Sequence, residues 1–162
     1  MLKYYLIFKV LAVALMELSG QVTEVRQRNQ EQTVLPRVFL LGNHEQPYEE
    51  MMERYDKLFI NVFKDDLDKA YEVWSGFLLD LEAHSRTQGF ELNGLKLWLN
   101  VFFNEDGGIQ HLVYFPKPNS RNMNFDQLTH FFMSFSKDYH LKESPKIRCS
   151  HFGSASFPTY LR

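Results

Sequence analysis

The sequence predicts an α+β domain in which a small antiparallel sheet of three strands packs against helices. Three observations lead to this fold class. Apolar residues recur at helical spacing twice between residues 47 and 88, the period changes from 3.6 to 2 after Gly94, and a further helical stripe begins after residue 124. The predicted order is therefore helix, helix, strand, strand, helix, strand, and residues 34–162 are expected to form one domain.

The first 20 residues differ from the rest of the chain. Lys3 gives a positive start, an apolar run continues to Leu18, and cleavage is expected before Gln21. This pattern is typical of a signal peptide, so we expect a periplasmic or secreted protein with no stable membrane insertion after cleavage. A retained membrane anchor is the alternative, although the run is shorter than the roughly 20 residues that span a bilayer. The polar residues 21–33 are expected to be a flexible lead.

Composition narrows the classes of function. The chain has 162 residues, of which 44% are hydrophobic, so it can bury a core. Its net charge is −2, and loss of the signal peptide, with two basic residues and one acidic residue, brings the charge to about −3. An acidic chain without a basic face is a poor nucleic-acid binder. Cys149 is the only cysteine, so no internal disulfide can form.

Two helices are expected between residues 47 and 88. Pro47 suits a first helical turn, and the second helix is expected to start after a cap at Asp65 or Asp66 and to end at Gly89. Gly76 lies within this second helix and is predicted to allow a neighbouring element to approach closely. The second helix has the clearest apolar stripe in the chain: Leu67, Ala70, Tyr71, Trp74, Phe77, Leu78 and Leu81. Before both helices, residues 34–41 are expected to form an accessory strand or extended segment.

The second half of the chain predicts a β-hairpin, a third helix and a closing strand. Apolar side chains alternate from Leu95 to Phe103, a turn is expected at residues 104–108, and a second strand runs to Phe115. Asn124 can cap the third helix, and an extended stretch is expected over residues 146–157. We expect one core cluster from these elements: Trp74, Leu78, Leu99, Val101, Leu128, Phe131 and Phe135.

Few residues suggest catalysis or metal binding. No two of the six histidines have the i, i+4 spacing of a zinc-hydrolase helix, so neither a metal site nor a cofactor is expected. Cys149 and His151 would share one strand face but lie about 6–7 Å apart along it, which is too far for a direct hydrogen bond. Cys149 is expected to be a buried structural residue. Residues 153–156 are all small and are expected to pack closely against another element.

The loop 117–122 is a candidate anion site. Lys117, Asn119, Ser120 and Arg121 offer two cations together with amide and hydroxyl groups, directly before a helix start. The alternative interpretation is an ordinary solvated loop whose polar side chains satisfy the backbone of the turn.

A family resemblance covers the hairpin, the third helix and the closing strand. Gly94 stands directly before the first strand, residues 97–102 alternate, and Asp106-Gly107 forms a turn directly before Ile109. With the third helix and the closing strand, residues 94–157 resemble the C-terminal domain of TonB-type energy transducers, a bacterial periplasmic module. The Pro-rich span and the uncleaved anchor of a working transducer have no counterpart in this sequence. The resemblance therefore implies a TonB-like domain used on its own, with a helical addition over residues 47–88.

The resembled fold places the closing strand at an edge of the sheet. The apolar strand from Leu95 to Phe103 would then be central, and Lys146 and Arg148 would lie on the outer strand. The N–H and C=O groups of a free edge can accept an extended peptide by strand addition. Charged side chains also discourage indiscriminate pairing, so an edge that binds nothing is the alternative.

The sequence supports three hypotheses for function. The first is a non-enzymatic, exported interaction module that binds a protein or peptide. The second is a periplasmic protein that binds a small ligand or an anion in an aromatic groove beside the loop 117–122. The third and weakest is an unrecognised hydrolase, which would use Cys149, His151 and Ser154. The prediction adopted is that the protein is not an enzyme and has no catalytic residue.

Overall fold

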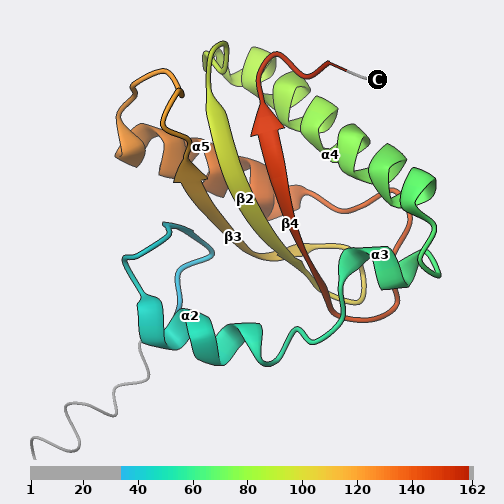
Figure 1. Cartoon of the computed structure of the whole chain (residues 1–162). Helices are drawn as coiled ribbons and strands as arrows, with labels where there is room; N and C mark the ends of the chain where they lie inside the picture. Colours follow the sequence, from blue (N-terminus) through green and yellow to red (C-terminus); the bar gives the residue numbers. More distant parts are fainter. Residues whose placement is uncertain (1–33, 161–162) are drawn as a thin grey trace, which may run out of the picture. The chain divides into compact units, whose positions relative to one another are not determined.

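The computed structural model describes residues 34–160, so the predicted signal peptide and the predicted lead lie outside the described residues. The fold is α+β, as predicted (Figure 1). Among residues 34–160, none of the helices is both long and apolar enough to cross a membrane. The elements in chain order are β1 (Val38–Leu40), α2 (Glu45–Met52), α3 (Phe59–Val62), α4 (Leu67–Gln88), β2 (Lys96–Phe103), β3 (Ile109–Pro116), α5 (Phe125–Asp138) and β4 (Cys149–Ser156).

The sheet has four strands in the order β1-β3-β2-β4. β2 is an inner strand and pairs antiparallel with both β3 and β4, as predicted. The fourth strand is β1, which pairs in parallel with β3, so that Val38 lies opposite Leu112. The prediction of a three-stranded, purely antiparallel sheet is therefore wrong. β1 joins the sheet because it has apolar side chains on both faces: Val38 enters the main core and Phe39 packs on the opposite side.

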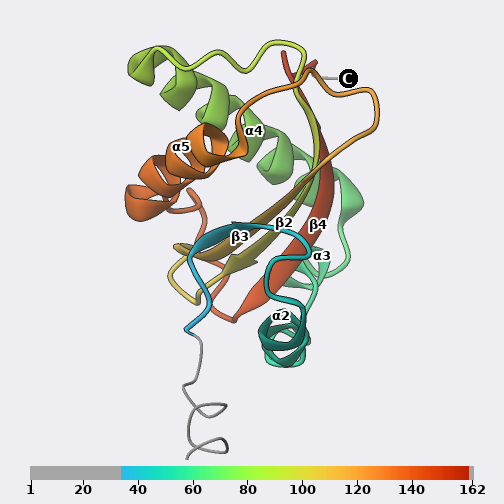
Figure 2. The same ribbon diagram turned by 90° about the vertical axis from the view of Figure 1, so that its left-hand side faces the viewer.

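Helices cover both faces of the sheet to different extents. α4 and α5 lie on one face, and the shorter α2 lies on the other (Figure 2). The main core fills the space between α4, α5 and the sheet, and it contains all seven residues predicted for it. A smaller cluster joins α2 to the second face: Phe39, Met51, Tyr55, Phe102 and Val113.

The helix predicted to start near Pro47 is broken into α2 and α3. Tyr55 packs on the second face, with its ring 5.0 Å from the ring of Phe102. Phe59 packs in the main core, with its ring 5.6 Å from the ring of Phe103. The chain passes from one face of the sheet to the other between these two residues, and this crossing interrupts the helix.

α4 agrees with its prediction at both ends. The Asp66 carboxylate accepts a hydrogen bond from the Lys69 N–H at 3.0 Å, which caps the first turn. Gly89 ends the helix in the left-handed conformation, with φ of 63°. The prediction for Gly76 is wrong, because a Cβ at this position would meet nothing within 4 Å. The close approach predicted for the small residues 153–156 is confirmed at Gly153, where a Cβ would lie 2.7 Å from Cζ2 of Trp74.

Candidate functional site

β4 forms an outer edge of the sheet, and part of that edge is free. The Ser150 N–H points away from β2 and donates to the Lys57 carbonyl at 3.0 Å. Backbone groups alternate between the two sides of a strand, so Phe152, Ser154 and Ser156 also direct their N–H and C=O groups outward. In the part of the chain that the structure describes, no backbone group pairs with these three residues on the outer side. We call residues 152–156 the free edge.

The free edge lacks the usual protection of an outer strand. Edge strands commonly carry lysine, proline or inward-pointing charges that discourage pairing with other chains. β4 contains no Lys, Arg, Asp, Glu or Pro, and residues 153–156 are all small. β4 itself therefore places no charged side chain, and beyond Phe152 no bulky one, in the way of another extended chain.

Three exposed aromatic residues come from the neighbouring strands β2, β3 and β4, and we call them the aromatic face: Trp98, Phe115 and Phe152. Trp98 lies opposite Phe115 in the β2–β3 pair. The Trp98 and Phe152 rings stack with their centroids 5.5 Å apart, and the Phe152 residue remains 64% exposed. Lys117 Nζ lies 4.0 Å from the centroid of the Trp98 ring and also donates a short hydrogen bond to Ser154 Oγ. The aromatic face thus continues the second face of the sheet up to the free edge.

The aromatic face is open because α2 covers only part of the second face. Asn100 marks the boundary, since its Nδ2 donates to the Tyr48 hydroxyl of α2 at 2.8 Å. Phe102, two residues further along β2, is buried under α2, whereas Trp98, two residues before Asn100, is 39% exposed. The alternation of side chains along β2 already indicates in the sequence that Trp98 points to the same side as Asn100 and Phe102. The aromatic face was nevertheless not among the predicted sites.

α4 supports β4 from the other side of the sheet. The Trp74 ring packs against Gly153 and lies 4.2 Å from the His151 ring. Glu82, further along α4, accepts a short hydrogen bond from the Thr159 N–H just after β4. These contacts fix β4 against the main core while its outer backbone groups stay free.

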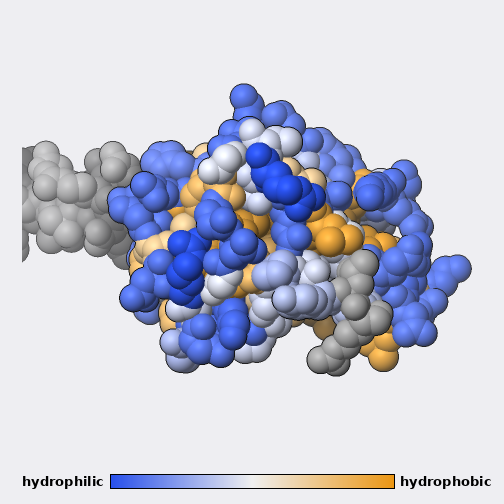
Figure 3. Space-filling model, turned by 90° about the horizontal axis from the view of Figure 1, so that it is seen from above, coloured by the Kyte–Doolittle hydropathy of each residue, from blue (hydrophilic) through white to orange (hydrophobic). Residues whose placement is uncertain are grey.

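Only Lys117, of the residues predicted as an anion site, reaches the aromatic face. Arg121 donates from Nε to the Asn93 carbonyl at 2.8 Å and from Nη2 to the Glu91 carbonyl at 2.7 Å. Ser120 Oγ accepts from the Lys96 N–H at 3.0 Å. Arg121 and Ser120 therefore anchor the loop to the start of β2, and Asn119 is exposed. This end of the sheet is seen in Figure 3, where hydrophilic residues predominate and smaller hydrophobic patches lie between them.

Lys146 and Arg148 do not lie on the free edge. β4 begins only at Cys149, because Lys146 has a φ of 65° and donates its N–H to the Glu105 carbonyl at 3.0 Å. Arg148 Nε lies 3.3 Å from a Glu105 carboxylate oxygen. Both residues therefore hold the start of β4 to the β2–β3 turn, and their placement on the outer strand is corrected.

The residues of the hydrolase hypothesis do not come together. Cys149 and His151 face the main core, whereas Ser154 lies on the opposite face with Lys117. Burial raises the pKa of the Cys149 thiol to about 12 and lowers the pKa of His151 to about 4. A thiol in this environment stays protonated at neutral pH and is a poor nucleophile.

Cys149 is expected to resist thiol reagents in the folded protein. The residue is fully buried, so a reagent in solution cannot reach its sulfur. Burial also disfavours the thiolate, which is the form that reacts. Reaction with an aromatic disulfide reagent at neutral pH should be negligible in buffer and complete in denaturant, measured by the absorbance of the released thiolate. Rapid labelling in buffer would contradict the placement of Cys149 in the core.

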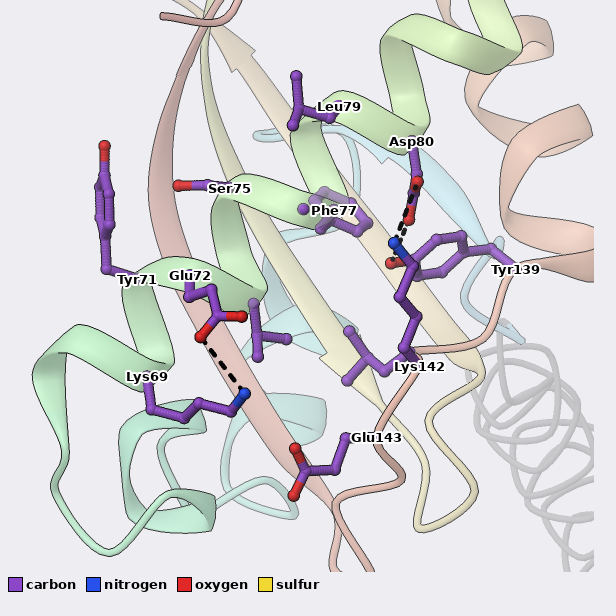
Figure 4. A pocket seen from close by; sticks show the side chains of 13 residues that line it. Lys69, Tyr71, Glu72, Ser75, Phe77, Leu79, Asp80, Tyr139, Lys142 and Glu143 are labelled. Carbon is purple, nitrogen blue, oxygen red and sulfur yellow. Dashed lines mark hydrogen bonds and ion pairs between the residues drawn. The ribbon is translucent and has the colours of Figure 1, made fainter. Parts of the chain in front are cut away.

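A hollow of about 570 Å³ lies away from the sheet edge (Figure 4). It is lined by α4 and by the segment after α5, and not by the loop 117–122. Tyr71 and Ser75 point to one side of α4, and Asp80 points to the other side, toward Tyr139 and Lys142. This hollow is thus separate from both sites that the sequence predicts.

Comparison with family models, with curated proteins and with solved structures gives no match for this chain. The resemblance of residues 94–157 to a TonB-type domain therefore stays a prediction, and any function has to be argued from the site itself.

Proposed function

We propose that this protein is an interaction module that binds an extended peptide by strand addition at the free edge. The observation that carries the proposal is the row of outward backbone groups at Phe152, Ser154 and Ser156, on a strand without charged residues or proline. A peptide that pairs there would extend the four-stranded sheet by a fifth strand. Strand addition is a recurring mode of peptide recognition in which main-chain hydrogen bonds contribute much of the affinity.

The aromatic face supplies the side-chain contacts that such a peptide needs. A net backbone hydrogen bond contributes only about 0.5–1.5 kcal/mol, so a short ladder alone binds weakly. A peptide residue opposite Phe152 would project onto the same face as that ring. Phe152 is 64% exposed and lies next to Trp98, so it can bury apolar surface against an added side chain.

The proposed partner is a protein segment in the compartment that the predicted signal peptide specifies. We propose further that the protein is not an enzyme and that its domain is TonB-like. The TonB-like assignment rests on the sequence resemblance of residues 94–157. The alternative small-ligand or anion site has less support, because Arg121 and Ser120 are engaged with the backbone of the neighbouring segments. Lys117 is the one predicted anion-binding residue that lies at the aromatic face.

The test compares a proline and an alanine at Ser154. Random peptides displayed on phage are selected on the purified protein, and the affinity of the enriched peptides is measured by fluorescence anisotropy. Ser154→Pro removes an outward N–H and should weaken binding by about tenfold or more while the melting temperature changes little. Ser154→Ala keeps the N–H and should retain binding.

A second proline controls for the orientation of β4. Ala155→Pro removes an N–H that faces β2 and should lower the melting temperature, because it breaks the sheet itself. Equal peptide affinity in wild type and Ser154→Pro would overturn strand addition at this edge. Failure of the selection to enrich any peptide would overturn it as well.

A further inference from the structure

The hollow on the outer side of α4 contains a glycine that the fold does not explain. Gly76 lies in the middle of a 22-residue helix and lines the hollow. A Cβ at this position would meet nothing within 4 Å, so no described element needs the space. Glycine destabilises a helix interior relative to alanine, because it gains more freedom on unfolding. In the folded protein, the missing side chain at Gly76 leaves the helix backbone exposed to the hollow and makes the hollow deeper at this point.

Asp80, at the wall of the hollow, is a partly buried carboxylate with weak partners. The Tyr139 hydroxyl donates to Asp80 Oδ2 at 3.5 Å, and Lys142 Nζ lies 3.9 Å from Oδ1 (Figure 4). Both distances are at the long limit for such contacts. The Asp80 side chain is 35% exposed, whereas the Lys142 side chain is 84% exposed and contributes little to an ion pair. Burial and the nearby Asp80 carboxylate raise the pKa of Tyr139, so its hydroxyl stays protonated as a donor.

The remaining lining combines apolar walls with an excess of acid. Among the described ion pairs, Lys69 pairs with Glu72 and Lys142 pairs with Asp80, whereas none includes Glu143. The aliphatic and phenyl side chains of the lining are Val73, Phe77, Leu79 and Leu141. A cation that has a planar group with several N–H donors and an aliphatic stem matches this lining. The N–H donors suit the carboxylates, and the stem suits the apolar side chains. Such a planar group can donate to Asp80 through more than one N–H.

We propose that this hollow binds the guanidinium group of an arginine side chain on a protein partner. The guanidinium would pair with Asp80 and displace the exposed Lys142, and the stem would lie over Gly76 against Val73 and Leu141. The hollow is lined by α4 and by the segment after α5, and it is partly open to solvent. Small-molecule sites usually enclose most of their ligand, and a shallow site of this kind suits one side chain of a larger partner.

The experiment is a titration followed by the backbone amide signals of the ¹⁵N-labelled full chain. The probes are N-acetyl-arginine amide, its neutral isostere N-acetyl-citrulline amide, N-acetyl-lysine amide and agmatine. We expect saturable shifts centred on Gly76, Asp80 and Tyr139 with the arginine amide, and an affinity about tenfold higher than that of the citrulline amide. Gly76→Leu places an apolar side chain in the hollow, starting from a Cβ that would meet nothing within 4 Å, and should abolish the shifts.

Further variants separate the charge from the shape. Asp80→Asn should remove the preference for arginine over citrulline, and Lys142→Ala should leave that preference intact or increase it. Absence of saturable shifts, equal affinity for citrulline, or unchanged binding in Gly76→Leu would each overturn the proposal. Equal affinity for lysine would overturn the assignment to a guanidinium, and much tighter binding of agmatine would indicate a free small molecule instead of a protein side chain. These outcomes are independent of the strand-addition test.

Discussion

Truncation of Leu99 to alanine is expected to lower the free energy of unfolding by about 2–5 kcal/mol. Leu99 is completely buried in β2, with β3 on one side and β4 on the other. Removal of its side chain takes away apolar contacts at the centre of the main core and leaves a cavity. The neighbouring strands cannot close this cavity easily, because both are held to β2 by backbone hydrogen bonds. The loss is measured by chemical denaturation of the variant and the wild type.

Met133→Ala provides the matched control for this prediction. Met133 is also a large apolar residue, but it lies on α5 with 41% of its surface exposed. Its truncation leaves little cavity and introduces a better helix former, so the change should stay within about 0.5–1 kcal/mol. A loss below about 1 kcal/mol for Leu99→Ala would mean that β2 is not the central strand of the core.

The sequence predicted the central part of the fold because its periodicity is local. The alternation of β2, the Asp106-Gly107 turn and the stripe of α4 are each visible within about 20 residues. The position of β4 at the edge came from the resemblance and agrees with the observed strand order. Local patterns of this kind do not depend on where distant segments lie, so they were sufficient for these elements.

Long-range pairing explains what the sequence did not predict. β1 is only three residues long, and its partner β3 lies about 70 residues further along the chain, so nothing local indicates the parallel pair. The break between α2 and α3 has a similar cause. Tyr55 and Phe59 have helical spacing, but they pack on opposite faces of the sheet, which is a property of the tertiary structure.

The strand predicted to form a sheet edge is an edge strand in the structure, but two of the residues predicted for it, Lys146 and Arg148, precede that strand. Lys146 and Arg148 were predicted there because the extended stretch was expected to begin at residue 146. Instead, the Lys146 backbone N–H and the Arg148 guanidinium both contact Glu105, before β4 begins. Apart from Phe152, the free edge is made of backbone groups and the small side chains of residues 153–156, and this run of small residues predicts close packing but not an outward-facing backbone. The sequence alone does not show that Phe152 lies on an exposed aromatic surface, because this depends on the pairing of β2 with β4, which brings the Trp98 ring next to it.

Two glycine-to-alanine substitutions are expected to change stability in opposite directions. Gly153→Ala should destabilise the protein by about 1–3 kcal/mol, because the new Cβ would lie 2.7 Å from Cζ2 of Trp74 and 2.8 Å from Nε2 of His151. The Trp74 ring packs against Gly153 and also stacks on the Phe77 ring, with the two ring centroids 4.9 Å apart. It therefore cannot move away without disturbing the main core.

Gly76→Ala should stabilise the protein by about 0.5–1 kcal/mol, because the added methyl group meets no other atom and alanine favours the helix. Both effects are measured as shifts of the denaturation midpoint at constant slope. The collision at Gly153 is tested further by repeating Gly153→Ala in a Trp74→Phe background. The smaller ring should relieve the contact, so the cost of the alanine should fall by at least about 0.5 kcal/mol in that background. An unchanged cost, or stabilisation by both alanines, would show that Trp74 does not press on β4 at Gly153.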